Sequence, residues 1–309
     1  MTRRRVVAFG VLAVLFAAWW RTIGLPTDIT AALGWLWAAT ICWNVRLAPR
    51  EQLRFARDWL PVAAALIAYD VSRGLADTGS TPHVTGMMAA DRALFGGALP
   101  AVWLQRHLYD PAAVRWYDVL ASWVYFSHFV VVPVIAVVLW LRSRPMWTAF
   151  IVRWLILTAL GLATYFCYPA APPWWAAAHG MTPPVARISA RGWHDLGLHG
   201  AGNLITHGQA LANPVAAMPS LHAAFALFAV AFFARRVRRR WLPLLAAYPV
   251  AMAVTLVYTG EHWAIDVLAG WAYAAAALVG ARVLGAAAGR SGGGRQGGRR
   301  GGRQGDGER

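Results

Sequence analysis

The sequence predicts an all-α integral membrane protein, a polytopic bundle of about eight transmembrane helices. Of its 309 residues, 59% are hydrophobic, and the mean hydropathy is +0.45. Only 14% of the residues are charged, which is far below the share in a soluble domain of this length. Long apolar runs that end in arginine complete the pattern. Together these observations exclude an ordinary soluble domain.

The apolar runs place the predicted helices at residues 6–24, 29–45, 58–75, 118–141, 147–168, 220–235, 241–258 and 263–286. The first run follows Arg3-Arg4-Arg5, so it also has the pattern of a signal peptide. No clear cleavage site of small residues follows it, and Trp19-Trp20-Arg21 is an unusual flank for one. We therefore expect an uncleaved first helix.

The arginines indicate the orientation of these helices in the membrane. The chain contains no lysine, so all 29 basic residues are arginine. If the helices alternate in direction, most of the arginines outside the helices fall on one side: Arg3, Arg4, Arg5, Arg46, Arg50, Arg54, Arg57, Arg142, Arg144, Arg235, Arg236, Arg238, Arg239, Arg240 and those of the tail. The positive-inside rule then places both termini of a multi-pass cell-membrane protein in the cytoplasm. An odd number of helices would break this agreement.

Composition divides the chain into three regions. Residues 1–57 form an N-terminal helix pair, 58–288 a larger membrane domain, and 289–309 a Gly/Arg-rich cytoplasmic tail that we expect to be disordered. Arginine-glycine repeats can bind RNA, but beside a membrane helix attraction to anionic lipids is the simpler interpretation. We therefore expect no nucleic-acid partner.

Two long segments lie outside the membrane on the other side. Residues 76–117 carry apolar residues among scattered charges, a pattern that predicts an interfacial helix. Residues 169–219 are rich in proline, glycine and histidine and are predicted to be irregular. Long irregular loops at the mouth of a helical bundle are commonly functional.

The residues suited to chemistry lie where these loops meet helices. In Gly260-Glu261-His262-Trp263-Ala264-Ile265-Asp266, the histidine and Asp266 are spaced i, i+4 and share a helix face. The carboxylate can accept one ring N–H and leave the other nitrogen free to attack. An aspartate in an apolar helix is costly without a partner. Taken alone, this segment fits a structural His–Asp pair equally well.

A second segment, Pro219-Ser220-Leu221-His222, begins another helix. Ser220 is the predicted N-cap, where free backbone N–H groups favour a phosphate. His222 lies in the first turn and can protonate a leaving oxygen. Both helices run inward from the same side, so His222, His262 and Asp266 are predicted within about 5 Å of one depth. They are the groups needed to transfer a phosphoryl group through a covalent histidine intermediate.

These segments carry a family resemblance. The strings are Tyr168-Pro169-Ala170-Ala171-Pro172-Pro173-Trp174-Trp175, Asn213-Pro214-Val215-Ala216-Ala217-Met218-Pro219-Ser220-Leu221-His222-Ala223-Ala224 and Tyr258-Thr259-Gly260-Glu261-His262. Over residues 58–286 the chain resembles the type 2 phosphatidic acid phosphatase superfamily, in its branch of inositolphosphotransferases such as fungal inositol phosphorylceramide synthase. The resemblance implies a six-helix catalytic core in which His262 is the nucleophile, Asp266 orients it and His222 is the general acid.

The departures from that family concern its cations. The phosphatase branch has a Lys-x6-Arg-Pro motif and an arginine six residues before the nucleophilic histidine. This chain has no lysine, and Leu256 stands at the arginine position. Leu221 replaces the usual glycine before the second-motif histidine. Phosphoryl transfer requires neutralisation of the phosphate oxygens, so other residues must supply the charge.

Arg73, with Asp70 at i, i+3 on the third helix, is the first candidate for a phosphate-binding cation. Its predicted depth is near that of the histidines, although an ion pair that only locks the bundle is an equal alternative. Arg187 and Arg191, in the loop before the sixth helix, are second candidates, with solvated loop charge as the alternative. Ser127-His128 and His207 are further polar residues, of the kind that is more often structural than catalytic.

We therefore expect a membrane phosphotransferase that moves an (inositol) phosphoryl group from a phospholipid donor to a lipid or sugar-lipid hydroxyl through a phosphohistidine. A lipid phosphatase acting on phosphatidyl or polyprenyl phosphate is the alternative. A non-enzymatic transporter or scaffold is a third hypothesis, in which His262–Asp266 is a proton relay or structural pair. No metal or other cofactor is implied, because no carboxylate cluster could hold one. The donor, the acceptor and the oligomeric state stay open.

Overall fold

The computed structural model describes residues 2–22, 29–75, 81–196 and 216–293. Within these ranges the protein is a helical bundle, and its β pairing consists of two isolated bridges. The predicted all-α membrane fold is confirmed. Helices occur at all eight expected positions: α1 (Arg3–Thr22), α2 (Ile29–Trp43), α3 (Pro49–Leu75), α6 (Trp116–Arg142), α7 (Arg144–Cys167), α11 (Leu221–Phe233), α12 (Leu242–Tyr258) and α13 (Ala264–Gly293).

Five helices in the described part of the chain are long and apolar enough to cross a membrane. They are α1, α6, α7, α13, and α12 together with the 3-10 turn η1 (Arg239–Trp241) that precedes it. Helix α11 is strongly apolar but has only 13 residues. The protein is therefore a multi-pass membrane protein, and the number of eight spans stays a prediction.

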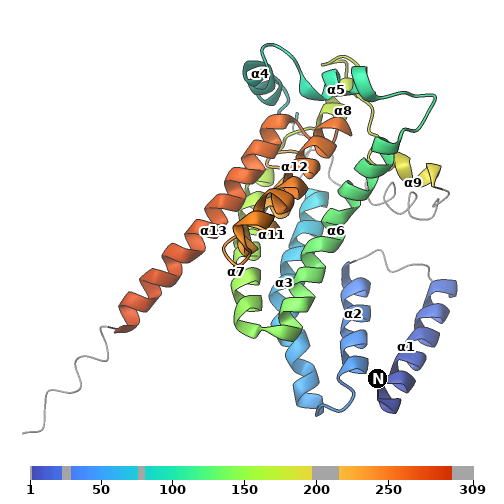
Figure 1. The fold of residues 1–309 in the computed structure, drawn as a ribbon, viewed down its shortest axis with the longest axis vertical. Coiled ribbons are helices and arrows are strands. Elements are labelled where there is room, and N and C mark those ends of the chain that lie inside the picture. The colour runs from blue at the N-terminus through green and yellow to red at the C-terminus, as the bar shows by residue number, and fades with distance from the viewer. Residues whose placement is uncertain (1, 23–28, 76–80, 197–215, 294–309) are drawn as a thin grey trace, which may run out of the picture.

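Short helices gather at one end of the bundle, where Figure 1 shows α4 (Thr85–Leu94), α5 (Pro100–Leu108) and α8 (Pro173–Ala178) close together. The single interfacial helix expected within 76–117 is wrong, because two helices form there. Gly96 and Gly97 separate them with φ of 61° and 89°, in the left-handed region that favours glycine. The loop 169–219 also contains helices, α8 and α9 (Arg191–Asp195).

Two helix boundaries differ from those predicted. Helix α3 begins at Pro49 instead of residue 58, so Arg50, Arg54 and Arg57 lie in the helix and not in a loop. Proline suits the first helical position, and Glu51 complements the helix dipole in the first turn. Helix α13 continues to Gly293, so 289–293, expected to be disordered, are helical; the rest of the tail lies outside the described residues.

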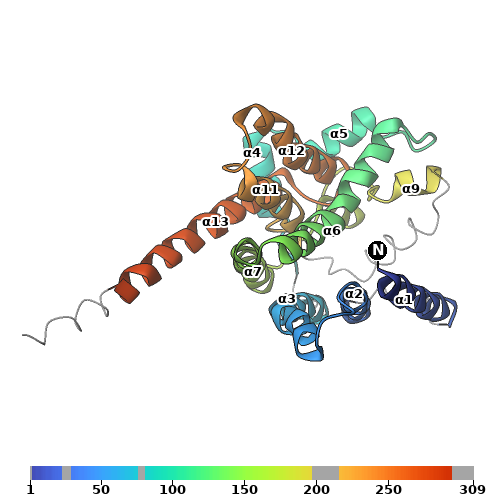
Figure 2. The ribbon, with the colours of Figure 1, turned by 60° about the horizontal axis from the view of Figure 1, so that its bottom comes forward.

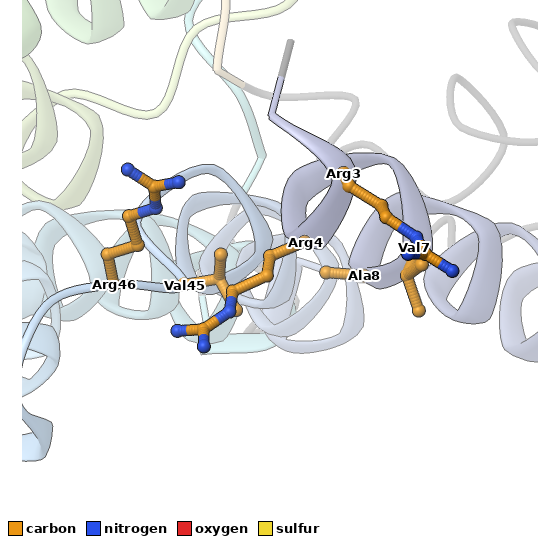
Figure 3. Close-up of a pocket in the computed structure, with 6 residues that line it drawn as sticks. All are labelled: Arg3, Arg4, Val7, Ala8, Val45 and Arg46. Atoms are coloured by element: carbon orange, nitrogen blue, oxygen red, sulfur yellow. The ribbon is translucent and has the colours of Figure 1, made fainter.

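The helix pair α1–α2 lies beside the main bundle, with α2 against α3 and α3 against α7 (Figure 2). Near the start of α1 and the end of α2 is a pocket, lined by Arg3, Arg4, Val7, Ala8, Val45 and Arg46 (Figure 3). This end is opposite to α4, α5 and α8 in Figure 1. Helix α11 contacts α6, α7, α12 and α13, so it is the central helix of the larger unit.

Among the described glycines, the tightest packing is at Gly270 of α13, against the residue that caps α11. A Cβ atom added to Gly270 of α13 would lie 2.3 Å from the Ser220 carbonyl oxygen. Glycine is therefore required there, because real side chains do not tolerate so short a contact. This contact sets the distance between the two segments that carry the histidines.

We predict that Gly270→Ala forces α11 away from α13 and lowers the free energy of unfolding by about 1–3 kcal/mol, as overpacking does. Gly280→Ala on the same helix is the control, since nothing lies within 4 Å of a Cβ added there. Alanine favours helix, so that variant should unfold at or above the wild-type temperature. Thermal unfolding in detergent measures both, and equal midpoints for the two variants would contradict the packing described.

Candidate active site

Three loop segments far apart in sequence pair at the end of the bundle that carries the short helices. Parallel bridges join His83 to Ala170 and Ala170 to Ala216, and the Ala217 N–H donates to the Ala170 carbonyl over 2.9 Å. The pairing leads the chain into α11, whose N-cap Ser220 accepts the Ala223 N–H at 3.3 Å. The Ser220 hydroxyl caps the helix, as predicted; its role toward phosphate stays a prediction.

His262 lies in the turn between α12 and α13. The chain reverses at Gly260, whose φ is +76° and where an added Cβ would lie 2.9 Å from the Ala186 oxygen. The His262 side chain is buried, and its Nδ1 is 2.9 Å from the Ala217 carbonyl oxygen. A carbonyl can only accept, so Nδ1 carries the hydrogen and Nε2 of the neutral ring presents its lone pair.

Asp266 is fully buried beside this ring. Its Oδ2 is 3.7 Å from His262 Nδ1 and also accepts the Trp263 N–H at 2.9 Å. We expected the carboxylate to be the acceptor of the ring N–H, but the Ala217 carbonyl is nearer. Asp266 instead places a negative charge next to the ring while it caps the first turn of α13.

His222 faces His262, with 5.6 Å between the ring centroids. The structure thus brings together His222, His262 and Asp266, the three residues predicted to be catalytic. Two rings of α6 hold His222: Tyr125 stacks on it at 5.2 Å, and His128 lies 4.0 Å away. Sequence reasoning had favoured a structural role for His128 and had not placed it beside the histidine pair.

Arg187 is the predicted cation that the structure places near the histidines. Its guanidinium forms a two-point ion pair with Glu261, with Nε 2.9 Å from Oε1 and NH2 3.0 Å from Oε2. It lies over the Trp174 ring at 4.9 Å and interacts with the Tyr125 hydroxyl. Because Glu261 precedes His262 and Tyr125 stacks on His222, Arg187 touches the neighbours of both histidines.

The other predicted cations are placed differently. Arg191 lies 3.8 Å from the Asp118 carboxylate and donates to the Asp110 carbonyl at 2.5 Å, so it ties α9 to the start of α6. Asp70 and Arg73 belong to α3, but their side chains lie outside the described residues. Their part in phosphate binding stays a prediction.

Two buried polar residues that sequence reasoning missed support the site from the short helices. Asp91 of α4 accepts the N–H groups of Ala264 and Ile265 at 3.1 and 2.8 Å, so it caps α13. Burial raises the pKa of the Asp91 carboxyl, although these two hydrogen bonds oppose the shift. Gln105 of α5 donates to the Ala186 and Tyr258 carbonyls at 2.8 Å each, which holds the backbone beside Arg187.

The class of protein to which this chain belongs follows from its similarity to a known family. Residues 85–280 match the model of the PAP2 superfamily, and the chain belongs to this type 2 phosphatidic acid phosphatase superfamily, as the motifs indicated. It is therefore a membrane enzyme of phosphoryl transfer or phosphate-ester hydrolysis, which sets aside the transporter and scaffold hypothesis.

A curated relative supports the transferase branch. The chain is similar to the phosphoinositol dihydroceramide synthase of Bacteroides thetaiotaomicron, with 30% identity over 226 residues, 68% of this chain and 71% of the relative. No solved structure matches the chain. The family match lies inside the predicted catalytic region 58–288, whose boundaries stay a prediction.

We predict that Asp91→Ala destabilises the start of α13, because it leaves one buried and one half-buried N–H group without an acceptor. The cost should be about 2 kcal/mol, with a loss of activity as His262 shifts. Arg92→Ala, at the exposed neighbouring position, is the control and should change neither property. Thermal unfolding and product formation measure both effects; an Asp91→Ala enzyme as stable as Arg92→Ala would contradict the capping role.

Proposed function

We propose that this protein transfers a phosphoinositol group from a phospholipid donor to a lipid or sugar-lipid hydroxyl through a phosphohistidine at His262. The observation that carries this proposal is the pair of facing imidazoles, His222 and His262, 5.6 Å apart beside the buried Asp266. In the neutral His262 ring, the Ala217 carbonyl selects the tautomer that leaves the Nε2 lone pair for attack, and His222 is available for proton transfer. Such a pair supports a two-step displacement.

In the first step, His262 Nε2 forms a bond to phosphorus while the P–O bond to diacylglycerol breaks. His222 gives its proton to the departing diacylglycerol oxygen. In the second step, the acceptor hydroxyl oxygen attacks phosphorus, the N–P bond breaks, and His222 takes the hydroxyl proton. Asp266, 3.7 Å from Nδ1, stabilises the positive charge that His262 acquires in the intermediate.

We assign Arg187 to the phosphate oxygens. It lies next to the neighbours of both histidines and carries a fork of donors suited to phosphate. The N–H groups in the first turn of α11, capped by Ser220, supply further positive potential. In this proposal, these groups supply the positive charge that a lysine and an arginine supply in the phosphatase branch. This chain has no lysine, and Leu256 occupies the position of that arginine.

Transfer is favoured over hydrolysis by two observations. The relative from Bacteroides thetaiotaomicron is named a phosphoinositol dihydroceramide synthase, and this name supports phosphoinositol as the transferred group and a lipid alcohol as the acceptor. The lysine of the phosphatase branch is also missing. Lipid phosphate hydrolysis is the alternative, in which water takes the place of the acceptor.

We further propose that the site faces the extracytoplasmic side and that both termini are cytoplasmic. His262 lies two residues before Ala264, which is held by Asp91 of α4. The α2–α3 and α6–α7 connections lie at the end opposite to α4 (Figure 1), and arginines lie in or beside both of them. The positive-inside rule assigns that arginine-rich end to the cytoplasm.

We predict that His262→Ala abolishes turnover and that His222→Ala lowers it by about 10²–10⁴-fold, the usual contribution of a general acid. His179→Ala removes an exposed histidine at the same end and should retain wild-type activity. Diacylglycerol release in proteoliposomes measures all three variants. Activity of His262→Ala at the wild-type level would refute the covalent mechanism.

A second prediction separates transfer from hydrolysis. With phosphatidylinositol as donor, adding ceramide should produce a phosphoinositol lipid and suppress release of free inositol phosphate. Product lipids are measured by mass spectrometry. Inositol phosphate or phosphate as the sole product, with every lipid acceptor offered, would favour the hydrolase.

A further inference from the structure

Glu261 is a carboxylate that the mechanism above does not use. It directly precedes His262, is 7% exposed and forms the two-point ion pair with Arg187. The Ser189 hydroxyl donates to the same carboxylate at 2.5 Å. These contacts fix the carboxylate of Glu261 beside Arg187, the proposed phosphate-binding cation.

The pairing lowers the positive charge that the site offers to a phosphate. Arg187 contributes one positive charge, and Glu261 offsets it across 2.9 and 3.0 Å. The chain has no lysine to restore the balance, and Leu256 occupies the position of the phosphatase-branch arginine. Arg191, the other described candidate, is paired with Asp118.

Substrate classes differ in the charge that they bring to such a site. A phosphomonoester carries about 1.5 to 2 negative charges at pH 7, whereas a phosphodiester carries one. A phosphate-binding arginine already paired with a carboxylate gains less from the extra charge, and the carboxylate repels a dianion more than a monoanion. The arrangement therefore favours the diester.

We propose that Glu261 is a specificity-determining residue that makes the site select phosphodiester lipids over phosphomonoester lipids. The inference rests on the proposed attack of His262 and names the residue that restricts the substrate class. In this account the fold and the histidines permit either reaction, and the Arg187–Glu261 pair decides which lipid reaches the phosphohistidine.

The test compares two lipids with identical acyl chains and the same leaving group. Phosphatidylmethanol is the smallest diester, and phosphatidic acid is the monoester; each releases diacylglycerol when His262 attacks. For purified full-length protein in mixed micelles, kcat/KM is measured for both. We expect the wild type to prefer phosphatidylmethanol and Glu261→Gln to raise the monoester-to-diester ratio about tenfold.

Two controls isolate the charge of Glu261. Glu261→Asp keeps the charge and should keep the wild-type ratio. Asp110→Asn removes a carboxylate paired with Arg115 on the same end of the bundle and should leave the ratio unchanged. A wild-type preference for phosphatidic acid, or an unchanged ratio in Glu261→Gln, would overturn the inference.

Failure of this inference differs from failure of the proposed mechanism. Diacylglycerol release that survives in His262→Ala would refute the mechanism itself, whereas His262-dependent release with no diester preference would refute only the role of Glu261. If the Glu261→Gln protein cannot be produced, the inference is tested on the wild type instead. The measurement is then how strongly phosphatidic acid inhibits the turnover of phosphatidylmethanol. Weak inhibition supports the inference, and binding as tight as that of the diester contradicts it.

Discussion

A backbone hydrogen bond of 2.9 Å from the Ser220 N–H to the Asp266 carbonyl joins the start of α11 to the first turn of α13. It is possible only because Gly270 has no side chain at the point of contact. His222 follows Ser220 by two residues, and His262 precedes Asp266 by four. Backbone packing at this junction therefore fixes the separation of the two imidazole rings. The chemistry proposed for the protein depends on this junction, because two imidazoles act on one phosphate only at a set distance.

The junction is supported from outside the bundle. Asp91 on α4 caps α13, and Gln105 on α5 fixes the loop beside Arg187. Each is a buried polar side chain with its partners satisfied, which specifies one arrangement of the backbone. The short helices therefore act as supports of the site, in addition to any contact with the membrane surface. Rigid support of this kind is what preorganised catalytic groups need.

The sequence predicted the fold and the histidine site because both have local signals. Apolar runs and arginine positions located the helices, and the i, i+4 spacing joined His262 to Asp266. The pairings that it missed join residues far apart in the chain: Asp91 and Ile265 are separated by 174 positions, and Arg187, itself a predicted cation, is 74 positions from Glu261. Such pairs leave no periodic pattern. The division of 76–117 into two helices was not predicted, because scattered apolar residues on both sides of Gly96 and Gly97 suggested a single interfacial helix.

The central claim, a covalent intermediate on His262, is tested most directly by trapping that intermediate. Protein mixed with phosphatidylinositol without an acceptor, quenched at alkaline pH and digested, is analysed by mass spectrometry of the peptide that contains His262. The account predicts an inositol-phosphate adduct on this histidine, absent when donor is omitted. An adduct on another residue, or none on His262 while diacylglycerol is released, would contradict it.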